Sequence, residues 1–82
     1  MELVELTKEI VTSLATDKDS VEVKEFDTDE ENTVLIQVMV SNDDAGRVIG
    51  RGGKNINAIR TILKASSSLH DHKYINLNVE SF

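Results

Sequence analysis

Four residues near the middle of the chain, Gly50-Arg51-Gly52-Gly53, have the composition of a loop that binds phosphate groups. Glycine adopts backbone angles that are closed to other residues and, because it has no β-carbon, it lets another backbone approach closely. A helical pattern begins at Lys54, so free N–H groups and the positive end of a helix dipole are expected beside the loop. Arg47, Arg51 and Lys54 add positive charge. A glycine loop, a helix N-terminus and three cationic side chains at one place favour a polyanionic backbone as ligand over a single ion.

The charges of the chain are distributed unevenly around this loop. The formal net charge is −6, which by itself disfavours a nucleic-acid partner. Residues 45–70 nevertheless contain no acidic residue, and their basic residues are Arg47, Arg51, Lys54, Arg60 and Lys64. This cationic segment favours an anionic partner at the loop. The alternative is that these residues are ordinary surface charge.

The hydrophobic pattern of the N-terminal half predicts one helix and two strands. Apolar residues at spacings of three and four predict a helix that ends near Thr16. Residues 21–26 alternate as a short strand whose pattern slips at Phe26, which predicts a bulge or an edge position there. Residues 33–40 are apolar on one face and partly apolar on the other, as in a strand at the centre of a sheet.

The C-terminal half predicts two helices around the glycine loop and a last strand. A short helix over 45–49 follows polar residues that can cap it, and a second helix runs over 54–65. Residues 66–72 read as a polar loop, and 74–80 as a strand. The resulting order is α-β-β-α-α-β. It predicts an α+β two-layer fold, in which three helices cover one face of a three-stranded sheet.

Length and composition restrict the class of protein. Eighty-two residues form one domain, and the absence of cysteine excludes disulfides and thiol chemistry. No apolar run is long enough to span a membrane, so we expect a cytoplasmic protein without a membrane partner.

Catalytic and metal sites find no support in the sequence. The loop fails the G-x-x-x-x-G-K-[S/T] pattern of ATPases, because Asn55 follows Lys54. His70 and His72 make a poor metal site, and Asp43 and Asp44 are interpreted as helix caps. We therefore expect no enzyme activity, no metal and no cofactor.

The residues around the loop resemble a known family. Val48-Ile49-Gly50-Arg51-Gly52-Gly53-Lys54-Asn55-Ile56 has the form V-I-G-x-x-G-x-x-I, which resembles the core motif of KH domains. The helix and strand before this core resemble the bacterial, type II arrangement. The longer string from Asp44 to Arg51 is similar to the single-domain bacterial KH proteins of the KhpA family. The resemblance covers essentially the whole chain. It implies one KH domain over 1–82, with its core motif at about 33–80 and a helix and strand extension at 2–26.

The resemblance implies that single-stranded RNA is the ligand. In KH domains the G-x-x-G loop clamps the backbone of about four nucleotides. Beside the loop, Val48, Ile49 and Ile56 are candidates for the floor of an apolar groove, although Val48 and Ile56 also suit the core. The 66–73 loop and the start of the last strand would form its far wall. The implied RNA-binding residues are Arg47, Ile49, Gly50, Arg51, Gly52, Gly53, Lys54, Ile56 and Arg60.

The same resemblance implies partners. Proteins of this family are thought to form homodimers and to act with a second RNA-binding protein, KhpB, in RNA chaperoning, post-transcriptional regulation and control of cell elongation. An alternative is a protein-interaction or dimerisation module that keeps the KH fold and binds nucleic acid weakly. Phe26 is a candidate for a core or dimer contact, and Tyr74 for a strand edge.

One residue departs from the family pattern. Similar proteins usually carry a basic residue at the second variable position of the loop, where this chain has Gly52. The loop therefore has one positive charge fewer and more conformational freedom to lose on binding. We expect weaker or more salt-sensitive RNA binding than in a typical relative.

Overall fold

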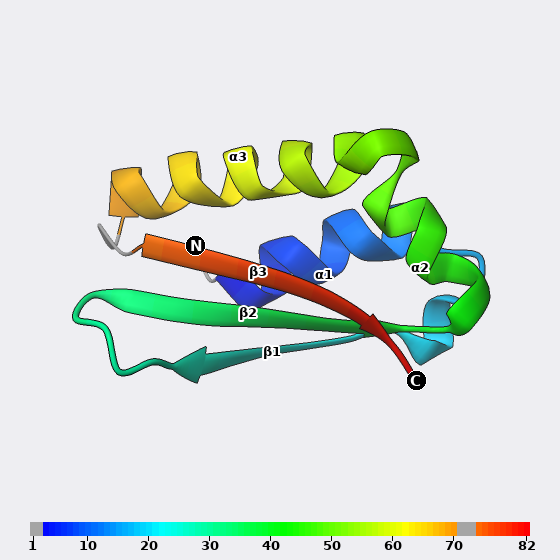
Figure 1. Cartoon of the computed structure of the whole chain (residues 1–82), viewed down its shortest axis with the longest axis horizontal. Coiled ribbons are helices and arrows are strands. Elements are labelled where there is room, and N and C mark those ends of the chain that lie inside the picture. The colour runs from blue at the N-terminus through cyan, green and yellow to red at the C-terminus, as the bar shows by residue number, and fades with distance from the viewer. Residues whose placement is uncertain (1–2, 71–73) are drawn as a thin grey trace.

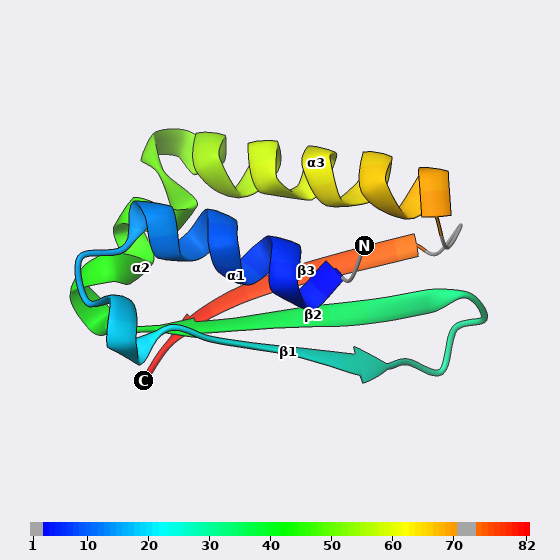
Figure 2. The ribbon, with the colours of Figure 1, turned by 180° about the vertical axis from the view of Figure 1, so that it is seen from behind.

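Three strands and three α-helices form two layers in the computed structural model, which describes residues 3–70 and 74–82 and, within the last helix, side chains as far as Ser67. The helices cover one face of the sheet (Figures 1 and 2). Short 3-10 turns lie at Lys18–Ser20 and Arg51–Gly53. In chain order the elements are α1 (Leu3–Leu14), β1 (Glu22–Asp27), β2 (Thr33–Val40), α2 (Asn42–Ile49), α3 (Lys54–His70) and β3 (Tyr74–Ser81). The predicted element order and α+β fold are confirmed.

The sheet has the order β1-β2-β3, with β2 in the centre as predicted. β1 pairs with β2 in antiparallel fashion, and β3 pairs with β2 in parallel. The pairing of β1 runs without interruption past Phe26, which lies opposite Leu35. The edge position predicted for Phe26 is therefore right and the bulge is wrong. The side chain of Phe26 is 47% exposed, so a core contact is also wrong.

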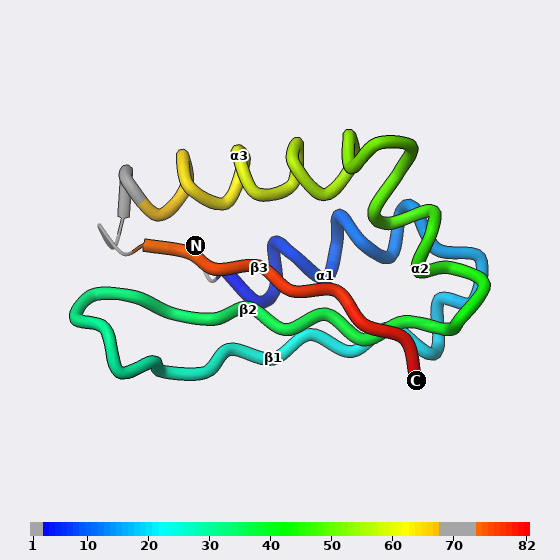
Figure 3. Tube along the Cα trace, viewed as in Figure 1, coloured from blue at the N-terminus to red at the C-terminus, as the bar shows by residue number. Residues whose placement is uncertain are grey.

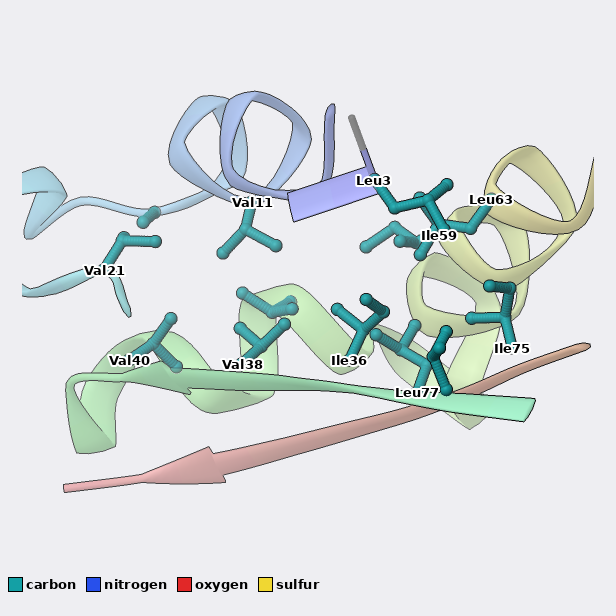
Figure 4. Packing of buried hydrophobic residues seen from close by; sticks show 13 residues of the cluster. Leu3, Val11, Val21, Ile36, Val38, Val40, Ile59, Leu63, Ile75 and Leu77 are labelled. Atoms are coloured by element: carbon teal, nitrogen blue, oxygen red, sulfur yellow. The ribbon is translucent and has the colours of Figure 1, made fainter. Parts of the chain in front are cut away.

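The core lies between the sheet and the helices and is aliphatic (Figure 4). One face of β2 is completely apolar and nearly inaccessible, because alternate residues of a strand point to the same side. Val11 of α1 and Leu63 of α3 meet this face from above. Burying each such side chain contributes about 1.5–3 kcal/mol relative to exposure, so the helices are held firmly on the sheet.

Two helices extend beyond their predicted bounds. α2 begins at Asn42, three residues before the predicted start. α3 continues to His70, so the loop predicted over 66–72 is wrong for residues 66–70, while 71 and 72 lie outside the described residues. Ser67 is fully buried and follows Leu63 by four residues, so it continues the buried stripe of α3. This packing outweighs the modest helix penalty of serine, about 0.5 kcal/mol per residue.

Within the described ranges, none of the helices combines the length and the apolar character that a membrane span requires.

Candidate nucleic-acid interface

The glycine loop, residues 50–53, lies where the chain turns from α2 into α3 (Figure 3). The Gly50 N–H donates to the Gly46 carbonyl at 2.8 Å, and the Gly53 N–H donates to the Gly50 carbonyl at 3.1 Å. Gly50, Gly52 and Gly53 have φ angles of 78°, 65° and 80°. Side chains disfavour this left-handed region, so the tight turn explains why the loop is rich in glycine.

Gly50 also allows α2 and α3 to approach each other closely. A β-carbon at Gly50 would lie 2.8 Å from the backbone nitrogen of Asn55, which is closer than real contacts allow. The Asn55 side chain donates through Nδ2 to the Arg47 carbonyl at 2.7 Å, so the start of α3 is fastened to the end of α2. Gly52 differs, because a β-carbon there would meet no atom within 4 Å. Gly50 therefore fixes the turn, and Gly52 faces open space.

The loop is accessible from outside. Arg51 and Gly52 are exposed, and Gly50 and Gly53 are half-buried. Lys54, the first residue of α3, is also exposed. The positive end of the α3 dipole and two cationic side chains therefore adjoin the same accessible turn.

The other predicted basic residues make contacts of their own. Arg47 donates through Nη1 to the Asp43 carbonyl at 2.8 Å and to Asp44 Oδ1 at 3.3 Å. Arg60 lies further along α3 and donates through Nη1 to Asn57 Oδ1 at 2.8 Å. The structure thus brings Arg47, Arg51 and Lys54 to the loop and leaves Arg60 along the helix. The charge of Arg47 is partly balanced by Asp44.

The apolar side chains predicted beside the loop differ in exposure. Val48 is fully buried and belongs to the core, Ile56 is half-buried against the core, and Ile49 is 37% exposed. Ile49 therefore provides most of the apolar surface next to the glycine loop.

The predicted far wall of a groove at 66–73 is wrong in its described part. α3 begins at the glycine loop and runs to the opposite end of the molecule, a distance of about 25 Å for its length (Figure 1). Residues 66–70 and the start of β3 consequently lie far from the loop. Residues 71–73 lie outside the described residues.

A buried carboxylate that the sequence reasoning assigned as a cap positions α2 instead. Asp44 is fully buried, lies inside the first turn of α2, and ties it to the turn after α1. Its oxygens accept hydrogen bonds from the Thr16 N–H at 2.9 Å, the Thr16 hydroxyl at 2.8 Å, the Asp17 N–H at 2.9 Å and the Ser41 hydroxyl at 3.1 Å. These donors, the Thr16 backbone N–H first, hold the pKa of Asp44 far below its usual range, although burial acts in the opposite direction.

The capping role predicted for Asp43 and Asp44 is therefore wrong. The N-cap position of α2 is Ser41, and both aspartates lie inside the helix. Ser41 is one of the four polar residues, 41–44, that were predicted as possible caps, and its carbonyl accepts hydrogen bonds from the N–H groups of Asp44 and Ala45 at 3.0 and 3.1 Å. No group of three potential metal ligands occurs in the described ranges, and the side chains of His70 and His72 lie outside them.

Comparison with known proteins agrees with this fold. Residues 4–79 match the KH-domain model of KhpA and KhpB. The chain belongs to the KhpA/KhpB KH-domain family. Its fold is accordingly the type II KH fold, which the V-I-G-x-x-G-x-x-I motif predicted together with the helix and strand before it.

Similar proteins include several that carry the name RNA-binding protein KhpA. The protein of Caldanaerobacter subterraneus subsp. tengcongensis is 38% identical over 63 residues, which cover 77% of this chain and 81% of the relative. That of Thermotoga maritima is 32% identical over 92% of this chain and 95% of the relative.

Solved structures of Era share the fold. Era in complex with MgGDPNP and nucleotides 1506–1542 of 16S ribosomal RNA superposes with a TM-score of 0.72 at 19% identity, over 98% of this chain. Aquifex aeolicus Era bound to GDP.AlF4- gives a TM-score of 0.67 at 18% identity, over 96% of this chain. The chain spans about three-tenths of each Era chain.

Proposed function

We propose that the chain binds single-stranded RNA through the glycine loop, as an RNA chaperone or post-transcriptional regulator that acts with a partner protein. The observation that carries this proposal is the accessible turn at the start of α3, flanked by the exposed cations Arg51 and Lys54. Phosphodiester groups fit such a turn, because glycine permits close approach and the helix end is positive. The names of the KhpA relatives support the choice of RNA.

The side chains around the loop suggest how an RNA strand would lie. Its backbone would pass over the loop between Arg51 and Lys54, and its bases would contact Ile49 and the exposed part of Ile56. Arg60, further along α3, would reach the same strand. Arg47 would add a phosphate contact by exchanging its bond to the carboxylate of Asp44 for one to RNA.

The decisive experiment replaces the charge and the flexibility of the loop together. In the variant Arg51→Asp with Gly52→Asp, negative charge occupies the turn, and aspartate tolerates the left-handed φ of Gly52 better than most residues. RNA affinity should fall about tenfold or more, since a favourable contact becomes repulsive. Fluorescence anisotropy with labelled single-stranded RNA measures this, and circular dichroism checks that the variant is folded.

A matched control places the same change of charge elsewhere. Lys24 and Asn76 are exposed on β1 and β3, on the sheet rather than at the loop. The variant Lys24→Asp with Asn76→Asp should retain most of the RNA affinity. If the folded loop variant and the control bound RNA equally well, the chain would instead be a protein-interaction module that keeps the KH fold.

A further inference from the structure

All three aromatic side chains of the protein are exposed. Phe26 is 47%, Tyr74 73% and Phe82 63% accessible, and the core contains aliphatic residues alone among its buried hydrophobics. Aromatic side chains bury a large area when they are enclosed, and they are enriched in protein–protein interfaces. In a small domain with little core, their placement at the surface favours a second surface that covers them.

Two of these aromatic residues lie on the face of the sheet that the helices leave open. Phe26 lies opposite Leu35, and Tyr74 lies opposite Thr33. Thr33 and Leu35 are two residues apart on β2, so they and their partners lie on the same side of the sheet. Val34 and Ile36, which alternate with Leu35, point into the core, so Leu35 and its neighbours point away from the helices. Cross-strand spacing brings the aromatic rings within reach of Leu35. Phe26, Leu35 and Tyr74 thus form an apolar patch on the open face.

The surroundings of this patch are strongly acidic. Beyond Phe26, the turn that joins β1 to β2 carries three exposed acidic residues, Asp29, Glu30 and Glu31. Glu22 and Lys24 share the open side of β1 with Phe26, whereas Glu25 and Asp27 lie opposite the buried Ile36 and Val34 and point to the other side. Glu80 of β3 adds another carboxylate to the open face, in the same row as Glu22 and Met39. The glycine loop lies on the opposite layer, at the turn above α2 (Figure 2). The molecule therefore presents an apolar patch bordered by acidic residues on the open face of the sheet, and a separate basic loop on the opposite layer.

We propose that the open face of the sheet, centred on Phe26, Leu35 and Tyr74, docks a basic segment of a partner protein that also carries apolar side chains. Charge complementarity identifies this occupant, because basic side chains would meet the acidic turn at 29–31 while apolar ones cover the patch. A second copy paired symmetrically through this face would set the acidic residues against each other. Nucleic acid would be repelled by the same carboxylates.

The location allows both ligands to bind together. A partner on the open face leaves the glycine loop accessible, so RNA and protein would occupy opposite layers of one small domain. This inference shares one element with the proposed function, which is that a partner protein acts together with this chain. It does not require that RNA binds at the loop.

The test uses a short synthetic peptide in which lysines are interspersed with leucines, and a peptide with glutamates in place of the lysines. Titration into the isotope-labelled full chain should give saturable amide shifts in β1 and in β2, and the glutamate peptide should give none. Phe26→Ser should weaken binding of the lysine peptide about tenfold. Ile62→Ser is the matched control, because Ile62 is 46% exposed but lies on α3, and it should leave binding unchanged.

Several results would overturn the proposal. These are the absence of saturable binding, shifts confined to the helical layer, and equal loss in the two serine variants. A concentration-dependent dimer that Phe26→Ser abolishes and Ile62→Ser preserves would identify a second copy as the occupant. Shifts on the open face upon addition of single-stranded RNA would identify nucleic acid. The variant Arg51→Asp with Gly52→Asp should bind the peptide normally, so failure of the RNA proposal is distinguished from failure of this one.

Discussion

The carboxylate of Asp44 and the backbone N–H of Thr16, separated by 28 positions in the sequence, are joined by a hydrogen bond of 2.9 Å. The same carboxylate accepts from Asp17 and Ser41 and contacts Arg47. It therefore connects the turn after α1, the start of α2 and a basic residue beside the glycine loop. The position of the candidate RNA-binding turn depends on this buried group, which lies inside the fold and not at the surface of the turn.

Asp44→Asn should destabilise the protein. The amide group of asparagine can replace only one of the two accepting oxygens, so its NH2 would face a backbone N–H or a hydroxyl that has lost its acceptor. The melting temperature should fall by roughly 5–15 °C. Thermal unfolding followed by circular dichroism measures this. The exposed neighbour Asp43→Asn serves as the control and should change the melting temperature little; a similar loss in both variants would contradict the role of Asp44.

The stability contributed by Asp44 should depend on pH. The pKa of this carboxyl is depressed in the folded state, chiefly by the Thr16 N–H. A depressed carboxyl pKa stabilises the fold above the unfolded-state pKa, about 3.9, and the contribution is lost as the pH falls through the folded-state pKa. The difference in urea midpoint between the wild type and Asp44→Asn should hence be largest near neutral pH and shrink below about pH 4. If the difference in urea midpoint stayed constant down to about pH 2, the pKa of Asp44 would not be depressed in the folded state.

Alanine substitutions at Gly46, Gly50 and Gly52 should change the free energy of unfolding by different amounts, because the three glycines have different surroundings. Gly50→Ala forces a β-carbon against Asn55 at a φ of 78°, and should cost about 2–4 kcal/mol. Gly52→Ala meets open space and should cost about 1–2 kcal/mol from its φ alone. Gly46→Ala, inside α2 with nothing within 4 Å, should stabilise by about 0.4–1 kcal/mol. Urea unfolding measures all three free energies, and the order would be refuted if Gly50→Ala were the mildest.

Gly52→Lys should strengthen RNA binding. Its added charge should also make binding more sensitive to salt, so of the two expectations for the Gly52 loop only the weaker binding is retained. The open space at Gly52 accommodates the side chain, and one more cation at the turn should steepen the salt dependence by about one unit of the logarithmic slope. Gly52→Gln imposes the same backbone cost without the charge and is the control. Binding isotherms at several salt concentrations measure both. If the lysine and glutamine variants had equal slopes, the loop would not contact phosphate.

Local sequence signals predicted the elements that local interactions determine. β2 was predicted with its bounds because its apolar residues mark both faces, and the glycine loop because three of its residues require positive φ. The motif around this loop also identified the family.

Features that depend on distant contacts were not predicted. The start of α2 depends on Asp44 and its partners near Thr16, which a run of polar residues does not reveal. The extension of α3 depends on the burial of Ser67, a residue whose type favours a loop. Exposure of Phe26 depends on which face of the sheet the helices cover, and an aromatic residue in a strand gives no sign of that.

The most direct test of RNA binding at the glycine loop is a titration of single-stranded RNA into the isotope-labelled protein, with backbone amide shifts followed by NMR. The largest shifts are predicted at residues 50–54, with smaller ones along the first turns of α3 and negligible ones in β1. Shifts that avoid residues 50–54, or that centre on the open face of the sheet, would contradict the proposed function.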